Sequence, residues 1–259
     1  RGITTSPINM YYSLIRADGD NMGKILLGKI CDIGIDIENY ILGLFEGKSK
    51  EIVSKVLSND ISSAKKIARS KGLEEEGIDE FNKFVNEIKS RGRIPVSISY
   101  HVSISRSLVI AALNDLKYVE ENNGVVIYAG GEDLLSVAPV RSAIKIISKS
   151  RLAYSGLAEG CSYGRFHKFN NYYMPSMGNA GRSYSLYIAH YRYPLYEVVK
   201  DSAFRLDGIA KGSKWVNGWS RRKDSLVITY SPRGMPESSV LPLSMEKPEF
   251  TFTDLTSFL

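Results

Sequence analysis

The sequence predicts an α+β fold, a ferredoxin-like sandwich in which helices cover one face of an antiparallel sheet. Three observations favour this fold. Periodicity and turn residues place strands and helices in the order β-α-β-β-α-β, with additional elements around this unit. Hydrophobic residues make up 43% of the 259 residues and charged residues 24%, as in ordinary globular chains. The longest apolar runs, such as 108–113, are far shorter than the ~20 residues that cross a bilayer, so no membrane association is expected.

The N-terminal part begins with a strand over Met10 to Ala17, which is rich in aromatic and aliphatic residues. An acidic turn follows, and then a short helix over Lys24 to Ile30. The stretch from about 32 to 98 is charged and helical in spacing, with glycines between short helices, so we expect a helical insertion there. Pro95 then precedes a long amphipathic helix over 99–122.

The second half supplies the rest of the sheet. Two short strands, 124–129 and 134–139, are joined by Gly130-Gly-Glu-Asp133 and indicate a hairpin. The segment 153–181 is rich in Gly, Asn, Ser and aromatic residues, which favours an ordered or binding loop. The other expected elements are a helix over 141–152, a strand over 183–190, a helix from Pro194 to near Lys211 and a strand over 225–230. We expect one domain over 1–232 and a tail or linker over 233–259 toward a further C-terminal domain, because the chain begins at Arg1 and its end is rich in Pro, Ser and Glu.

Charge and cysteine content limit the partners and the compartment. Lys and Arg number 34 against 28 Asp and Glu, and the net charge of +6 favours polyanionic partners such as RNA or nucleotides. Cys31 and Cys161 form no CxxC pair, which favours a reducing cytoplasm. Basic and aromatic residues interleave in two loops that could contact RNA or partner subunits, although a solvated basic loop is the more common outcome. These residues are Arg165, Phe166, Lys168, Tyr172, Lys214, Trp215, Trp219, Arg221, Arg222 and Lys223.

Two acidic clusters lie at expected strand ends and carry the chemistry. Asp18 and Asp20 follow the first strand, and Glu132 and Asp133 lie on the hairpin. In a split βαβ sheet these strands are neighbours, so the clusters can meet. Carboxylates gathered at one edge repel unless cations separate them, and two magnesium ions ~3.5–4 Å apart are the usual solution in nucleotidyl transfer.

Two alternatives concern the acidic turn after the first strand. A calcium-binding helix-loop-helix is excluded, because Met22 and Lys29 occupy its fifth and twelfth positions, where oxygen ligands are required. For Asp20 two roles stay open: it caps the helix that begins near Met22, or it is an outer-shell metal ligand.

Three separated motifs together resemble a known family. They are Ala17-Asp-Gly-Asp-Asn-Met-Gly-Lys24, Tyr128-Ala-Gly-Gly-Glu-Asp-Leu-Leu135 and Ala189-His-Tyr-Arg-Tyr-Pro-Leu195. They are similar to the palm domain of the large subunit of type III CRISPR effector complexes, the Cmr branch especially, over most of 11–230. The family usually has Gly-Gly-Asp-Asp on the hairpin, and this chain has Glu132 at the third position.

The resemblance implies roles for individual residues. Asp18, Glu132 and Asp133 would be the catalytic metal ligands for two Mg²⁺ or Mn²⁺ ions, with Asp20 as a less certain fourth. Lys211 resembles the lysine that related cyclases place on the triphosphate, and a lysine that balances a helix dipole is the alternative. The expected nucleotide-binding residues are Asn21, Met22, Gly23, Lys24, Ser105, Gly130, Gly131 and Lys211.

The resemblance also implies a function. The chain would be a cyclase-like nucleotidyltransferase palm that binds ATP and makes cyclic oligoadenylate when the complex recognises target RNA, and we expect it to be inactive as an isolated fragment. Its partners would be the other subunits, CRISPR RNA and target RNA, in the cytoplasm. The alternative is a catalytically weak structural palm that scaffolds the RNA-bound complex. A bacterial-style cyclic dinucleotide synthase is disfavoured, because no Gly-Gly-Glu/Asp-Glu-Phe sequence occurs.

Overall fold

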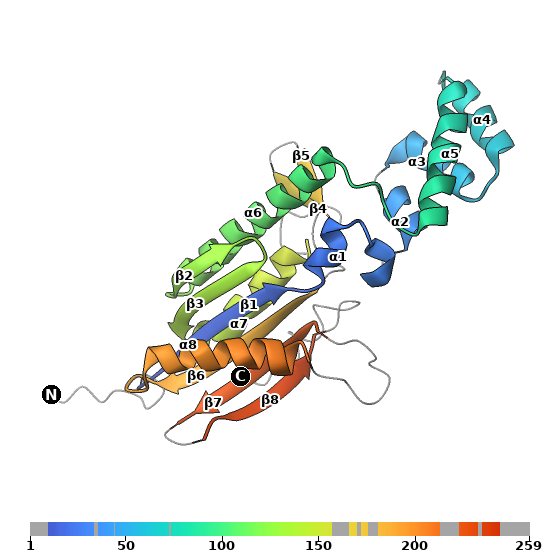
Figure 1. Ribbon diagram of the computed structural model, residues 1–259. Helices are drawn as coiled ribbons and strands as arrows, with labels where there is room; N and C mark the ends of the chain where they lie inside the picture. Colours follow the sequence, from blue (N-terminus) through green and yellow to red (C-terminus); the bar gives the residue numbers. More distant parts are fainter. Residues whose placement is uncertain are drawn as a thin grey trace. The chain divides into compact units, whose positions relative to one another are not determined.

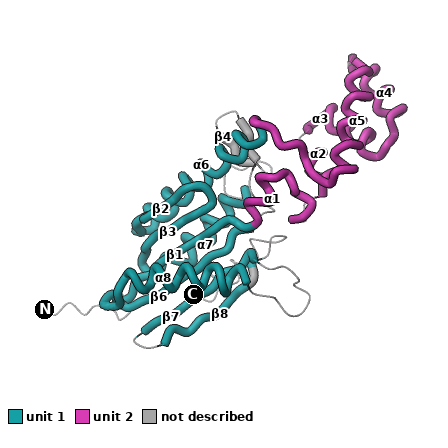
Figure 2. Tube along the Cα trace, viewed as in Figure 1, with its two compact units in different colours: residues 1–20, 99–259 teal, residues 21–98 magenta. Residues whose placement is uncertain are grey.

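The chain forms two compact units in the computed structural model (Figure 2). The first unit comprises residues 1–20 and 99–259, and the second comprises residues 21–98. The insertion expected at about 32–98 lies within the second unit, which begins at Asn21. The structure describes residues 10–33, 36–43, 45–72, 74–156, 166–169, 172–175, 181–212, 223–232 and 235–243.

The first unit is built on a six-stranded sheet with the order β2-β3-β1-β6-β7-β8 (Figure 1). Its strands are β1 (Tyr11–Gly19), β2 (Val125–Gly130), β3 (Asp133–Pro139), β6 (Arg182–His190), β7 (Ser225–Ser231) and β8 (Glu237–Pro242). The central strand β1 pairs antiparallel with both β3 and β6, and β2 pairs antiparallel with β3. This part has the predicted ferredoxin-like order, so the predicted fold class is confirmed.

Helices cover both faces of this sheet. On one face lie α6 (Ile98–Glu121) and α7 (Val140–Tyr154), as the ferredoxin-like order requires. On the other face lies α8 (Leu195–Phe204), whose Val198 packs against Leu14 and Tyr187 (Figure 1). A short π-helical segment, η3 (Arg205–Ala210), follows α8 directly and packs on β7 and β8. The helices are therefore not confined to one face, because the added helix after β6 buries the side chains of the second face.

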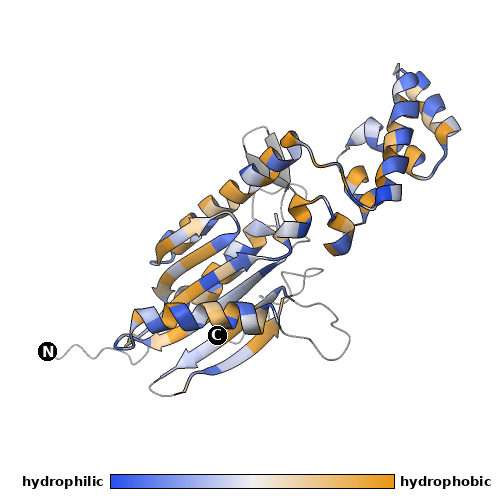
Figure 3. Cartoon of the chain, in the orientation of Figure 1, coloured by the Kyte–Doolittle hydropathy of each residue, from blue (hydrophilic) through white to orange (hydrophobic). Residues whose placement is uncertain are grey.

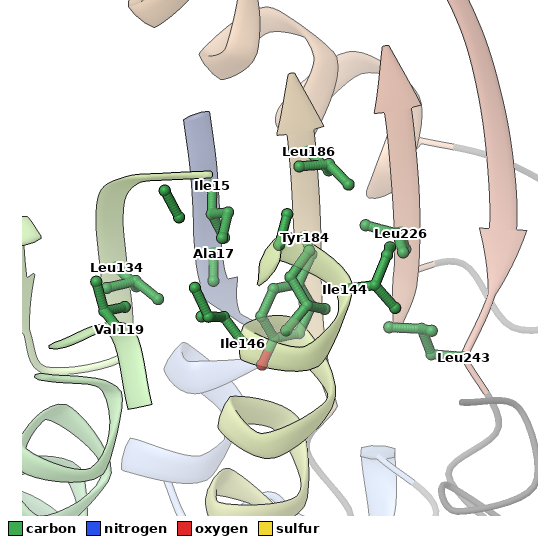
Figure 4. Close-up of a cluster of buried hydrophobic side chains, with 13 residues drawn as sticks. Ile15, Ala17, Val119, Leu134, Ile144, Ile146, Tyr184, Leu186, Leu226 and Leu243 are labelled. Atoms are coloured by element: carbon green, nitrogen blue, oxygen red, sulfur yellow. The ribbon is translucent and has the colours of Figure 1, made fainter. Parts of the chain in front are cut away.

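The main core lies between the sheet and α6 and α7 (Figure 4). Alternate residues of the strands, including Ile15, Ala17 and Tyr184, lie in one buried cluster with Ile144 and Ile146 of α7. Successive side chains of a strand point to opposite faces, so Leu14 lies in the core under α8 while Ile15 lies in the core under α7. The alternation along β1 fixes which of its terminal residues share a face.

The strand β8 lies in the stretch expected to be a tail or linker. It pairs antiparallel with β7 at the edge of the sheet. Leu241 packs against the core under α7, Val240 packs against η3, and Leu243 is buried. The sequence Glu237-Ser-Ser-Val-Leu-Pro242 carries only two apolar side chains before a proline, a pattern too short to distinguish an edge strand from a tail.

The remaining strands lie in the region expected to be a loop. They are β4 (Phe166–Phe169) and β5 (Tyr172–Pro175), which form a separate antiparallel pair. Most of the two basic and aromatic loops, including Arg165, Lys214, Trp215, Trp219, Arg221 and Arg222, lies outside the described residues.

The second unit consists of short helices with their own core. They are α1 (Met22–Leu26), η2 (Ile30–Ile33), α2 (Ile37–Leu42), α3 (Gly47–Leu57), α4 (Ile61–Ser70) and α5 (Glu76–Arg91). Apolar residues recur among polar ones along α3 to α5 (Figure 3). Val56, Ala64 and Val85 are among those that are buried. The helix expected over Lys24 to Ile30 ends at Leu26, because Gly28 adopts a φ of 69°. Within the described parts of the chain, no helix is both long and apolar enough to span a membrane.

Candidate active site

The carboxylates of the first strand and the hairpin meet at one end of the sheet. Ala17 pairs with Leu134, and one step further along this register places Asp18 opposite Asp133. Asp18 shares its face with Leu14, and Asp133 shares its face with Leu135 and Val137, so both lie on the face that α8 covers. Directly opposed acidic residues repel each other, so this pair favours a cation between or beside them.

Asp18 forms an ion pair with Lys211, which follows η3. Its Nζ lies 2.6 Å from Oδ2 of Asp18 and 3.5 Å from Oδ1 of the exposed Asp207. The Lys211 backbone N–H donates to Leu206 O, which closes the wide turn of η3 at 2.9 Å. The wider turn of a π-helical segment is frequent at functional sites. The structure therefore places Lys211 against a candidate metal ligand, where sequence analysis allowed either triphosphate binding or a dipole-balancing role.

The charges of this cluster perturb one another. Burial raises the pKa of Asp133, and the nearby charges of Asp18 and Glu132 raise it further, while Lys211 and Arg182 act in the opposite direction. Burial alone would lower the pKa of Lys211, but its hydrogen bond and charge interaction with Asp18, together with the charges of Asp207 and Asp20, raise it overall. A cation bound beside Asp133 would reduce its repulsion by the charges of Asp18 and Glu132.

Glu132 lies in the turn between β2 and β3. Gly130 pairs with Asp133, so the turn comprises Gly131 and Glu132, and Gly131 adopts a φ of 61° that favours glycine. Gly19 of β1 lies against this turn, because a Cβ on Gly19 would come within 2.6 Å of the Glu132 Cβ and would also clash with Tyr154 Oη. Gly19 lies on the α7 side of β1, so the stem of the Glu132 side chain also starts on that side of the sheet, opposite to Asp133.

Asp20 does not cap the following helix. The N-cap position of α1 belongs to Asn21, which has a φ of 58° and makes no side-chain cap hydrogen bond. Asp20 is 1% exposed, and its carboxylate accepts hydrogen bonds from Ser183 Oγ at 3.0 Å and from the Asp224 backbone N–H at 2.7 Å. The capping prediction is wrong, because the turn at Asn21 leaves the Asp20 side chain facing β6 and the start of β7. The role of Asp20 as an outer-shell ligand stays a prediction.

The predicted nucleotide-binding residues fall in different places. Asn21 to Lys24 follow Asp20 directly and belong to the second unit, where the Lys24 N–H donates to Asn21 O at 2.9 Å and the Lys24 ammonium to Asp32 O at 3.1 Å. Ser105 is exposed on α6. Gly130, Gly131 and Lys211 lie with Asp18 and Asp133 at the end of the sheet.

A buried polar cluster beneath the hairpin is missing from the sequence predictions. It joins Arg182 of β6 to Asp115 of α6 and Ser150 of α7, and all three are 1% exposed. A second buried ion pair, Arg151 with Asp224, lies nearby. One signal could have found it: Asp115 occupies the same helical stripe as Ala111 and Val119, and a charge on a buried stripe requires a partner.

The donor atoms fit a hard divalent cation in kind. In the described part of the chain, no three His, Cys, Asp or Glu side chains form a group that could hold a metal ion by themselves. Mg²⁺ needs no such cage, since it is commonly bound by one or two carboxylates together with substrate phosphates and water. Asp18 and Asp133 supply two carboxylates on one face, and Glu132 lies close enough to influence the pKa of Asp133.

The fold and these carboxylates together define a palm domain, and comparisons with known proteins place it. The family model of the Cas10/Cmr2 second palm domain matches residues 11–220. The chain is 31% identical to the CRISPR system CMR subunit Cmr2 of Saccharolobus solfataricus, over 92% of this chain and 28% of that protein. It is 24% identical to Cmr2 of Pyrococcus furiosus, over 78% of this chain and 17% of that protein.

Solved structures agree with this match. The type III-B Cmr-beta complex in its apo state has a chain with a TM-score of 0.67 and 30% identity, covering 96% of this chain and 29% of the other. The same complex bound to cognate target RNA gives a TM-score of 0.66 and 30% identity, covering 91% of this chain and 28% of the other. The chain belongs to the Cas10/Cmr2 family, within its second palm domain. It spans less than a third of the length of these relatives.

Proposed function

We propose that this chain is the metal-dependent nucleotidyltransferase palm of a type III CRISPR effector large subunit. It would bind ATP and make cyclic oligoadenylate when the complex recognises target RNA. The observation that carries the proposal is the opposed pair Asp18 and Asp133, which lies at a sheet end that also holds Lys211. Burial first, and then the charge of Asp18, raises the pKa of Asp133. The relatives named as Cmr2 and as Cmr-beta complexes support the assignment to an effector complex with RNA.

The residues would divide the chemistry as follows. Asp18 and Asp133 would hold two Mg²⁺ or Mn²⁺ ions together with the nucleotide phosphates, and Glu132 would supply a third carboxylate. When bound, these ions lower the pKa of the attacking 3′-hydroxyl and offset the charge of the departing pyrophosphate. Lys211 would exchange its contact with Asp18 for the triphosphate, where its positive charge stabilises the developing negative charge.

The proposal is tested with Asp133→Asn. We expect saturable binding of ATP to the wild-type protein that requires Mn²⁺, measured by isothermal titration calorimetry. Asp133→Asn should weaken this binding at least tenfold, because it removes a charged ligand where two cations and a triphosphate meet. Glu121→Gln, an equal charge change on the exposed end of α6, should leave the binding unchanged. Equal Mn²⁺-dependent binding by Asp133→Asn and the wild type would contradict the metal assignment.

The second candidate is a structural palm that scaffolds the complex without turnover. The ion pair between Lys211 and Asp18 at 2.6 Å favours it, because a permanent salt bridge would neutralise one of the carboxylates. The enzyme and the scaffold are distinguished by measuring ATP binding and oligoadenylate formation in the effector complex assembled with this chain and target RNA. ATP binding and oligoadenylate formation are expected for the enzyme, and a stable RNA-bound complex that binds no ATP is expected for the scaffold.

A further inference from the structure

We infer that Arg182 is a positioning residue that holds the Gly130–Asp133 hairpin in place from the face of the sheet opposite to Asp18 and Asp133. The effect of Arg182 on metal binding rests on the proposed function, whereas its role in holding the hairpin does not. Arg182 lies at the start of β6, opposite Gly19 of β1. It shares its face with Tyr184 and Leu186, the face that α7 covers.

The contact with the hairpin runs through the backbone. Arg182 Nε donates a hydrogen bond to the carbonyl oxygen of Glu132 at 3.2 Å. This carbonyl belongs to the peptide bond that joins Glu132 to Asp133, so its position determines where the Asp133 side chain begins. A charged donor makes this hydrogen bond stronger than one between neutral groups.

The guanidinium is itself held by side chains of two other elements, α6 and α7. Its Nη2 lies 2.7 Å from Oδ2 of Asp115 on α6, and its Nη1 donates to Ser150 Oγ of α7 at 3.1 Å. The rings of Tyr154 and Tyr184 lie 4.8 Å and 5.7 Å from the guanidinium carbon. Because Arg182 is 1% exposed, it cannot contact a nucleotide, and its charge serves only groups within the fold.

These contacts require an arginine. A planar guanidinium presents donors in several fixed directions, so it can serve Asp115, Ser150 and the Glu132 carbonyl at the same time. A lysine would keep the charge beside Asp115, but its single ammonium on a flexible stem cannot reach all three acceptors. Arg182→Lys therefore removes the support of the hairpin while it leaves the buried charge pair in place.

The inference is tested by comparing Arg182→Lys with Ser150→Ala. Both variants weaken the buried cluster, but only the first removes the bond to the hairpin, since Ser150 contacts Arg182, Asp115 and Tyr184. Two measurements are made on the folded chain: hydrogen exchange of the hairpin amides, 130–133, by NMR, and Mn²⁺ affinity by electron paramagnetic resonance. Global stability is measured by urea denaturation for both variants.

We expect Arg182→Lys to speed exchange of the hairpin amides at least tenfold more than Ser150→Ala does, beyond any difference in global stability. Its Mn²⁺ affinity should fall by about 10-fold, the lower end of losses caused by removing an outer-shell partner. Should Arg182→Lys fail to fold, the double variant Arg182→Met with Asp115→Leu replaces the ion pair by apolar side chains, a change that buried pairs often tolerate.

The outcomes separate this inference from the proposed function. Hairpin exchange that is equal in the two variants would overturn the positioning role of Arg182. A wild-type chain that binds no Mn²⁺ would overturn only the proposed metal site. Hydrogen exchange of the hairpin amides would still test whether Arg182 holds the hairpin. Faster hairpin exchange with unchanged Mn²⁺ affinity would overturn the link between the hairpin and the metal.

Discussion

Asp18 and Asp20 are separated by one glycine and differ in what surrounds their carboxylates. Asp18 faces the α8 side of the sheet, is partly exposed, and pairs with Lys211. Asp20 is buried and accepts hydrogen bonds from Ser183 and from the Asp224 backbone, without a cationic side chain among these partners. Burial, with the charge of Asp224, outweighs these hydrogen bonds and raises the pKa of Asp20 from 3.8 to about 7.

This pKa predicts the pH dependence of stability. The folded protein binds a proton at Asp20 that the unfolded chain has released above its ordinary pKa of 3.8. The contribution of Asp20 to the free energy of unfolding is therefore fully present below about pH 4 and is lost as the pH rises through about 7. Asp20→Asn should flatten the change in the free energy of unfolding between these pH values by up to about 4 kcal/mol. Urea denaturation across this pH range measures it, with the exposed Glu120→Gln as control. A wild-type profile unchanged by Asp20→Asn would contradict the raised pKa.

Sequence analysis predicted the position of the site better than the roles of its individual residues. The pairing of Asp18 with the hairpin follows from strand order, and strand order follows from periodicity. The surroundings of Asp20 depend on Ser183 and Asp224, which are distant in sequence and belong to other strands or their flanks. Arg182 is the first residue of β6 and directly follows a stretch rich in glycine and asparagine, so no local pattern marks it as buried. Its role depends on long-range contacts that only the folded chain brings together.

Elements were predicted well where local signals were strong. The hairpin strands β2 and β3, the long helix α6 and the strand β6 lie within two residues of their expected bounds. Gly130 and Gly131 indicated the turn, and the β-branched residues on either side of it indicated the strands. The edge strand β8 was missed, because its stability comes from pairing with β7 and from packing of Leu241, and a single sequence shows neither.

The packing of β8 predicts that the end of the described chain belongs to the core. Leu243 is 5% exposed, and the Leu243 N–H donates to Asp224 O at 2.8 Å. Leu243→Ala should lower the free energy of unfolding by about 2–4 kcal/mol, because it leaves a cavity beside the core under α7. Ser239→Ala, an exposed change on β8, should stay within about 0.5 kcal/mol of the wild type. Urea denaturation that fails to separate these variants would show that β8 does not pack in solution.

At the scale of the whole molecule, the chain divides into two compact units with separate cores. The core of the first unit lies on both faces of the sheet, and its most deeply buried residues include Ile147 of α7. The second unit buries Val56 of α3, Ala64 of α4 and Val85 of α5 among its own helices. The proposed carboxylates and Arg182 all belong to the first unit, whereas the predicted nucleotide-binding residues Asn21 to Lys24 belong to the second.

Separate cores predict separate unfolding transitions. Ile88 of α5 is 3% exposed in the second unit, and Ile147 is 0% exposed in the first. Each Ile→Ala change should destabilise its own unit by about 2–5 kcal/mol, because the removed methyl groups leave a cavity in one core only. Differential scanning calorimetry should then show two transitions, with Ile88→Ala lowering the midpoint of one and Ile147→Ala lowering the midpoint of the other. Mn²⁺ affinity measured below both transitions should be unchanged in Ile88→Ala. One transition lowered equally by both variants would show that the two cores unfold as a single cooperative unit.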